Sequence, residues 1–172
     1  MRALTLWQPW ASLVAMGAKR WETRGWGTQY RGPLLIHAAQ RKPPRSSYSA
    51  DPRKPVELRS DLVLEMVEAL GVSEFETLPR GAVVAVAELV ACEHLVTTEQ
   101  VHELLYQTYG MGVGLAGREV LFGNWDLGRW VWKLDRVRPI TPPVPAAGGQ
   151  RLWKPSPGLA MVAGLADPPK GY

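Results

Sequence analysis

The chain has 172 residues, of which 46% are hydrophobic and 21% are charged, and its formal net charge is +4. These values are those of an ordinary globular protein, and they predict one domain over residues 1–172 with a buried core. The single cysteine excludes an internal disulfide, and the lack of a signal peptide or of an apolar run of about 18–20 residues predicts a cytoplasmic protein without a membrane partner.

The first forty residues predict short elements in quick succession. Pro9 suits the first turn of a helix, where its missing N–H costs nothing, and Gly17 is a natural C-terminal stop. Between them apolar residues follow helical spacing, whereas the stretches on either side show the alternation or the apolar runs typical of strands. We therefore expect a helix over residues 8–17 and strands over residues 3–7, 20–24 and 33–39.

The remainder of the chain continues as an irregular mixture of strands, helices and loops. Residues 129–137 alternate clearly, with Trp130, Trp132 and Leu134 on one side. The other expected elements are strands over 82–92 and 152–154, helices over 57–70 and 98–109, an exposed loop over 41–55 and a glycine-rich loop over 110–117. Because no βαβ period is present, the pattern predicts an α+β fold built on a small β-barrel.

Positive charge is concentrated at the N-terminal end of the chain. Residues 1–60 carry eleven Lys or Arg against three Asp or Glu, whereas residues 61–172 carry nine against thirteen. An anionic partner is expected to be attracted to the first third, although a solvated basic face without a ligand would show the same pattern. Four of the eight tryptophans also fall between Trp7 and Trp26, where their indoles either stack bases or pack in the core.

A dense polar cluster follows the predicted helix. In a strand, alternation places Glu22 and Arg24 on one face and Thr23 on the other, with Lys19 at the turn before the strand. Lys, Glu and Arg side chains that converge at one mouth can bind an anion, because a guanidinium makes bidentate contacts. They can also carry out proton chemistry, with Glu22 as base and Lys19 stabilising charge. A surface salt-bridge cluster would have the same spacing.

Other polar residues carry weaker signals. His37 lies in an apolar run, where a histidine is more often a core or rim residue held by hydrogen bonds than a catalyst. Cys92, His94 and His102 match no zinc spacing, so we expect no metal. The glycine-rich residues 110–117 lack the Lys-Ser/Thr of a phosphate-binding loop, and no cofactor is expected.

Three stretches near the N-terminus together resemble the ASCH domain. They are LTLWQPWASLV at residues 4–14, the pattern Gly17-x-Lys19-x-x-Glu22-x-Arg24, and YRGPL with IHAA between residues 30 and 39. The ASCH family shares this G-x-K-x-x-E-x-R motif. Residues 81–92, 122–134 and 145–153 resemble its later parts, and the resemblance is weakest over 43–78 and 95–120. The same pattern resembles the C-terminal domain of a eukaryotic transcription coactivator, activating signal cointegrator.

The resemblance implies a fold close to the PUA domain, which is a small β-barrel with short helices at its openings. PUA relatives bind RNA or modified bases, and ASCH proteins are proposed to bind RNA in a cleft lined by the shared motif. The resemblance therefore implies RNA or a nucleotide as the partner, and protein partners stay unknown. The implied cleft has a polar floor of Lys19, Glu22 and Arg24, a wall of Trp7, Gln8 and Trp10, and a rim of Trp26, Tyr30 and Arg31, with His37 as a further ligand contact.

Some ASCH proteins are enzymes, and the resemblance extends to them only in part. One small bacterial branch is an amidohydrolase for acetylated cytidine that uses a Lys, a Thr nucleophile and a Glu. Where that branch has its Thr, this chain has Glu22, and Thr23 would face away. A second branch cuts single-stranded RNA, for which Lys19, Glu22, Arg24 and His37 have suitable chemistry.

We therefore predict an RNA- or nucleotide-binding module with a cationic, aromatic-lined cleft. The alternative is a hydrolase that acts on RNA or on an acylated nucleoside. A protein-interaction domain that uses its tryptophan-rich surface is a third possibility.

Overall fold

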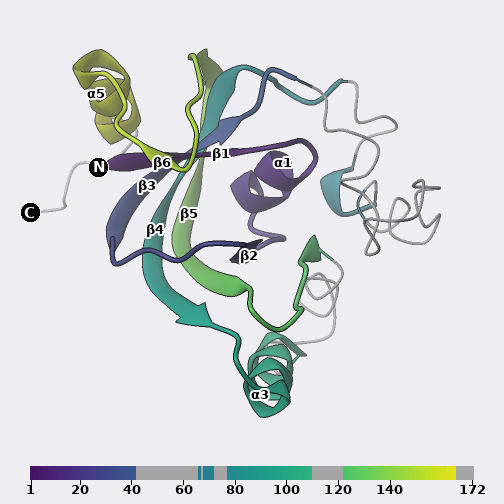
Figure 1. The fold of residues 1–172 in the computed structure, drawn as a ribbon. Coiled ribbons are helices and arrows are strands. Elements are labelled where there is room, and N and C mark those ends of the chain that lie inside the picture. The colour runs from purple at the N-terminus through teal and green to yellow at the C-terminus, as the bar shows by residue number, and fades with distance from the viewer. Residues whose placement is uncertain (42–65, 67, 72–76, 110–121, 166–172) are drawn as a thin grey trace, which may run out of the picture.

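The computed structural model describes residues 1–41, 66, 68–71, 77–109 and 122–165, and these form a curled sheet with short helices against it (Figure 1). Six strands are hydrogen-bonded in the order β2-β5-β4-β3-β1-β6, so that β2 and β6 are the two edges. The sheet curves into a half-barrel, which confirms the predicted α+β class. The strands are β1 (Arg2–Leu6), β2 (Trp21–Arg24), β3 (Gly32–Ala38), β4 (Ala82–His94), β5 (Trp130–Pro145) and β6 (Leu152–Trp153), and the helices are α1 (Trp10–Ala15), α3 (Thr98–Tyr109) and α5 (Pro157–Leu165).

The middle of the sheet is apolar on both sides. β1 and β3 are parallel, and the other strand pairs are antiparallel. Two central stretches are buried throughout, as expected for strands covered on both faces. They are residues 34–39, at the end of β3, and residues 82–87 of β4. α1 lies inside the curve and contacts β3, β4 and β5 (Figure 1), while α5 adds Leu159 to a smaller apolar cluster that contains Leu35 and Val83.

Helix α1 ends where the polar cluster begins. The helix is only six residues long, so its stability comes mainly from packing Ala11 and Val14 against the sheet. Gly17 follows with a φ of +79°, a left-handed conformation that favours glycine. The amide of Lys19 then donates to the carbonyl of Leu13 at 3.0 Å. This turn brings Lys19 against the start of β2.

Strand β5 is longer than the sequence predicts. Alternation indicates a strand over residues 129–137, but β5 continues to Pro145 because β4 goes on pairing with it. The register between β4 and β5 shifts at three points, and such bulges bend and twist a strand. The resulting curl brings the β2 edge close to β1, where the Arg24 side chain donates to the Thr5 carbonyl at 3.2 Å.

Every strand and helix predicted within the described residues is present. α5 was not predicted, because its sequence is apolar almost throughout and shows no polar face. The loop predicted over 41–55, the loop over 110–117 and most of the helix over 57–70 lie outside the described residues. No described helix is long and apolar enough to cross a membrane. The assignment of the whole chain to one domain stays a prediction.

Candidate functional site

Lys19 is completely buried, with 0% of its surface exposed. Its ammonium donates to the backbone carbonyls of Trp21 and Phe122, the latter at 2.8 Å, and lies 3.4 Å from a carboxylate oxygen of Glu22. An ammonium has three N–H donors, so these three partners satisfy it. Lys19 therefore ties the segment at Phe122 to β2 and holds Glu22, instead of facing solvent.

Glu22 joins Lys19 to Arg24. Its side chain is almost buried, with one carboxylate oxygen 3.4 Å from the Lys19 ammonium and the other 3.5 Å from Arg24 Nη1. The second terminal nitrogen of Arg24 donates to the Thr5 carbonyl. The structure thus brings the three motif side chains together in one chain of contacts that runs from the α1–β2 turn toward β1. Ion pairs of this kind are strong because little water screens them.

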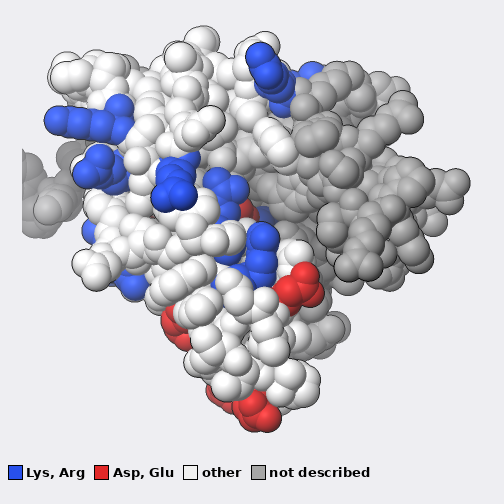
Figure 2. All heavy atoms as spheres, viewed as in Figure 1, with Lys and Arg blue, Asp and Glu red and all other residues white. Residues whose placement is uncertain are grey.

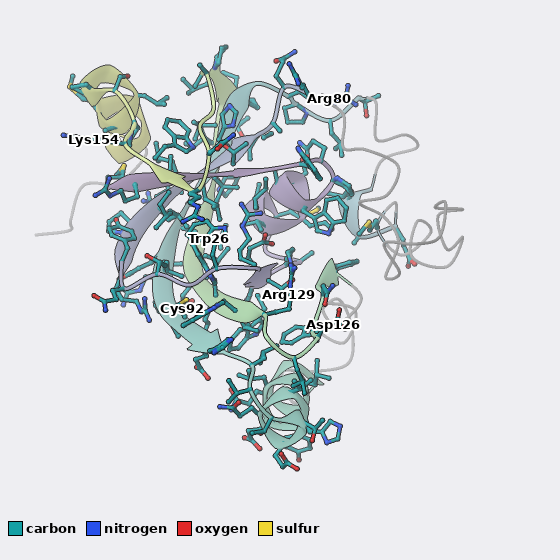
Figure 3. The ribbon with its side chains drawn as sticks, in the orientation of Figure 1. Trp26, Arg80, Cys92, Asp126, Arg129 and Lys154 are labelled. Carbon is teal, nitrogen blue, oxygen red and sulfur yellow. The ribbon has the colours of Figure 1, made fainter. Side chains whose placement is uncertain are left out.

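Of these three motif side chains, Arg24 is the one that reaches the surface, with 26% of its side chain exposed. Its guanidinium carbon lies 5.9 Å from the centroid of the Trp26 ring, within the range of a cation–π contact. Trp26 packs edge-to-face on the buried Trp132, at 4.7 Å between ring centroids. Figure 3 shows Trp26 over the middle of the curled sheet, with Cys92 and Arg129 on the side toward α3. The arginine and the indole together make an open cationic and aromatic surface.

Thr23 faces away from this surface. Its hydroxyl accepts a hydrogen bond from the Asn124 amide at 2.9 Å, and its carbonyl accepts one from Arg129 at 3.0 Å. The side chain is buried against the segment 122–125, on the opposite face of β2 from Glu22. The hydroxyl of Thr23 is therefore not presented to the carboxylate of Glu22.

The three residues of the expected wall differ in exposure. Trp7, just after β1, has 41% of its surface exposed and offers an open indole. Gln8 is buried, and its amide donates to Ser12 at 2.8 Å and to the Pro79 carbonyl at 2.7 Å. Trp10 is half-buried in an apolar cluster under α1. Gln8 and Trp10 therefore fix the start of α1, and Trp7 is the member of the three that is open to a ligand.

Two residues of the expected rim hold the loop between β2 and β3. The Tyr30 hydroxyl donates to the Pro33 carbonyl, and partial burial raises the pKa of this hydroxyl. The Arg31 guanidinium donates to the carbonyls of Thr28 and Tyr30, at 3.0 and 2.8 Å, and to that of Cys92 on β4. Three carbonyls thus share this cation, which fastens the loop to the sheet.

His37 lies inside the molecule, on β3 and beside β6. Its side chain is 1% exposed, with Nε2 2.9 Å from the carbonyl of Ala146 and its ring edge-to-face with Trp153. A carbonyl only accepts, so Nε2 carries the proton and Nδ1 is left as a buried acceptor without a partner among the described residues. Burial lowers the pKa of His37. The structure therefore places His37 in the interior and away from an open surface.

Sequence reasoning missed one cation beside Trp26. The guanidinium carbon of Arg151 lies 5.6 Å from the centroid of the Trp26 ring. Arg151 precedes β6, and its backbone has a φ of +54°, which is uncommon for a residue with a side chain. No local pattern links it to a residue some 125 positions earlier, so only the fold reveals the proximity.

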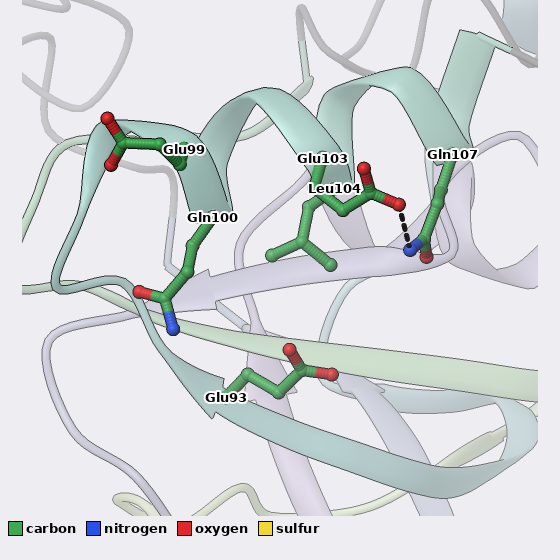
Figure 4. Close-up of a pocket in the computed structure, with 6 residues that line it drawn as sticks. All are labelled: Glu93, Glu99, Gln100, Glu103, Leu104 and Gln107. Atoms are coloured by element: carbon green, nitrogen blue, oxygen red, sulfur yellow. Dashed lines mark hydrogen bonds between the residues drawn. The ribbon is translucent and has the colours of Figure 1, made fainter.

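Charge is unevenly distributed over the molecule. In Figure 2, Lys and Arg gather over the middle and left of the face shown, and Asp and Glu lie mostly toward the end where α3 is placed. A pocket between α3 and the end of β4 is acidic (Figure 4), and an anionic ligand would be repelled there. It is lined by Glu93, Glu99, Gln100, Glu103, Leu104 and Gln107, none of which the sequence had suggested as a site residue.

The described residues contain no group of three or more His, Cys, Asp or Glu side chains placed to hold a metal ion. Cys92 accepts a hydrogen bond from the Thr28 amide, and burial raises the pKa of its thiol. His94 stacks on Trp130, with 4.5 Å between ring centroids and 11° between ring planes. These two side chains are therefore engaged in packing contacts of the sheet.

The sequence and the fold place the chain in a known family. The ASCH domain model matches residues 4–126, and the chain belongs to the ASCH domain family. It is similar to activating signal cointegrator 1 of Homo sapiens, with 33% identity, and to the same protein of Mus musculus, with 32%. Each match spans 89 residues, which is 52% of this chain and 14% of the relative. The matched segment is thus a small part of those larger proteins.

Proposed function

We propose that this chain is an RNA-binding module that holds single-stranded RNA, or a nucleotide or modified base, on the surface around Arg24 and Trp7. The observation that carries the proposal is the placement of Arg24, whose side chain is 26% exposed and is held by Glu22, which is held in turn by Lys19. Membership of the ASCH family supports it. We further propose that the half-barrel is part of a closed PUA-like barrel. We also propose that binding takes place in the cytoplasm.

The chemistry of this surface suits a nucleic acid. A guanidinium that is already held by a carboxylate loses little freedom when it binds a phosphate, and its planar N–H groups match phosphate oxygens. The indole of Trp7 is exposed, and stacking of a base on an aromatic ring is worth about 1–3 kcal/mol. In this proposal Lys19 and Gln8 do not touch the ligand, because their polar groups are already engaged in contacts within the protein.

The proposal is tested by titrating labelled single-stranded RNA at several salt concentrations with the wild type, Arg24→Gln and Arg136→Gln. Arg136 is a matched control, since its side chain is exposed and is paired with Glu88 on another part of the sheet. We expect binding that weakens with salt, and roughly tenfold weaker binding for Arg24→Gln, as for the loss of one hydrogen bond to a charged group.

Two results would contradict the proposal. One is a wild type that does not bind RNA at low salt, and the other is an Arg24→Gln variant that binds as tightly as Arg136→Gln. Because Arg24 also contacts Thr5, circular dichroism and a thermal melt must first show that the variant is folded.

A hydrolase acting on RNA or on an acylated nucleoside is the second candidate. The observation that favours it is the nearly buried carboxylate of Glu22 between two cations, which can stabilise charge that develops in a reaction. Against it, the hydroxyl of Thr23 is turned away from Glu22 and accepts a hydrogen bond from the Asn124 amide. A turnover assay on both substrates separates the candidates. Product formation that survives Glu22→Gln would exclude Glu22 as the base.

A further inference from the structure

Two segments that are distant in the sequence meet at the open side of the half-barrel. Arg24 ends β2, Trp26 follows it, and Arg151 comes from the turn before β6, which pairs with β1. The guanidinium carbons of Arg24 and Arg151 lie 5.9 and 5.6 Å from the centroid of the same indole ring. The contact from Arg24 to Thr5 shows that this is the place where β2 approaches β1. Trp26 therefore lies within cation–π range of two arginines that come from distant parts of the sequence.

The two arginines are only partly neutralised. Arg24 shares the single carboxylate of Glu22 with Lys19, so one negative charge serves two positive ones. Its Nε is buried and has no hydrogen-bond partner within the described chain. Arg151 is exposed, and its contact with Trp26 is its one recorded interaction with the described residues. Two cations near one ring repel each other, and an anion placed between them would relieve that repulsion.

The backbone of Arg151 adds a second observation. Its φ of +54° lies in the left-handed region, which a residue with a side chain enters at a cost. Strained residues of this kind concentrate at ligand-binding positions, where the surrounding structure holds them in place. Arg151 combines this backbone conformation with a guanidinium that lies beside Trp26.

Trp26 itself has little ring surface left for a base. Two guanidiniums lie over it, and it packs edge-to-face with Trp132 at 4.7 Å between ring centroids. Trp7, by contrast, is 41% exposed, and no aromatic or cation–π contact is recorded for it with other described residues. The two tryptophans therefore suit different tasks, with Trp7 available for stacking and Trp26 occupied in orienting arginines.

We infer that Arg24, Trp26 and Arg151 form a phosphate subsite, in which both guanidiniums hold one phosphate group of the RNA or nucleotide. Trp26 is a positioning residue in this subsite, because it acts through the arginines. The inference rests on the proposed function and names the part of the ligand that this surface takes. The phosphate is either a diester of the RNA chain or the terminal group of a nucleotide.

The subsite is tested by measuring the binding of 5′-phosphorylated single-stranded RNA, which offers both diester and terminal phosphates, to Arg151→Gln against salt concentration. The control is Arg136→Gln, because Arg136 is also exposed and also has a left-handed backbone, with a φ of +46°. We expect Arg151→Gln to bind roughly tenfold more weakly than the control and to lower the salt slope by about 0.7, the contribution of one phosphate contact to a single strand. If Arg151→Gln and Arg136→Gln bind alike while the wild type binds RNA, the subsite is wrong and the proposed function stands. If the wild type does not bind RNA, both the subsite and the proposed function are wrong.

The source of the phosphate is identified by two probes. One is an RNA oligomer without terminal phosphates, and the other is a nucleoside monophosphate. If the oligomer shows the dependence on Arg151, the subsite takes a backbone diester, and if only the monophosphate shows it, the subsite takes a terminal phosphate. If the binding of neither probe depends on Arg151, the inference is wrong.

The role of Trp26 is tested with RNA that carries an abasic site at each position in turn. If Trp26 orients arginines, Trp26→Leu weakens the binding of intact and abasic RNA by the same factor, and Trp26→Phe restores most of the affinity. A loss that disappears at one abasic position would show that a base stacks on Trp26. Trp26→Phe keeps the test valid if Trp26→Leu does not fold, since it preserves a ring against Trp132.

Discussion

Lys19 is a completely buried cation that holds the carboxylate of Glu22 and the carbonyl of Phe122. Alternation along β2 correctly predicts that Lys19, Glu22 and Arg24 come together. It does not predict depth, because burial of Lys19 depends on the carbonyl of Phe122, which arrives from a distant segment. The three motif residues therefore form two linked ion pairs, with the lysine in the interior, the glutamate between the two cations and the arginine at the surface.

Removal of the Lys19 charge should destabilise the fold strongly. In Lys19→Met the carboxylate of Glu22 loses a buried partner, and breaking a buried ion pair costs about 3–5 kcal/mol. The matched control is Lys133→Met, since Lys133 is exposed and contacts the ring of Trp21. Urea denaturation measures both. Equal losses in the two variants would show that Lys19 does not hold the fold as described.

His37 should make the stability depend on pH. Burial lowers its pKa in the folded protein below the ordinary value of 6.5, so between the two values the unfolded chain binds more protons. The contribution of His37 to the free energy of unfolding is therefore fully present above its ordinary pKa of about 6.5, and it is lost as the pH falls below that value. His37→Phe should flatten this part of the profile, and His102→Gln, on exposed helix α3, should not. An unchanged profile in His37→Phe would contradict the burial.

The elements differ in how far the sequence predicts them. Helix α3 was predicted with its observed limits, because its pattern is local. Strand β5 was predicted too short, since its second half is rich in proline and is held by pairing with β4. Such pairing depends on residues far along the chain, which a local pattern cannot report. For the same reason Arg151 was missed, although it lies beside the predicted Trp26.

The loop after β2 depends on Gly27 more than on Gly25. A Cβ at Gly27 would lie 2.3 Å from the ring of Trp130, whereas one at Gly25 would meet nothing within 4 Å. Gly27→Ala must therefore displace the loop that carries Trp26, at a cost of about 1–3 kcal/mol.

Thermal melts and RNA titrations of the two alanine variants test this close approach. Gly27→Ala should lower both stability and affinity, and Gly25→Ala should change neither. If Gly25→Ala weakens RNA binding as much as Gly27→Ala, the placement of the loop on Trp130 is not what supports the binding surface.

Positive and negative side chains lie on different sides of the described part of the molecule. Arginines surround Trp26 at the open side of the half-barrel, while carboxylates line the pocket beside α3. The basic first third of the sequence predicted the sign of the binding surface, but Arg151 lies outside that third. A ligand with a phosphate chain should thus be attracted to one side and repelled from the other.

The most direct measurement of where RNA binds is the response of the eight tryptophan indole N–H signals in NMR, assigned by single Trp→Phe variants. We expect added single-stranded RNA to shift the signals of Trp7 and Trp26 first, and the signal of Trp125, which packs with Trp21, to stay in place. Shifts at Trp125 and Trp21 without shifts at Trp7 and Trp26 would contradict the proposed surface.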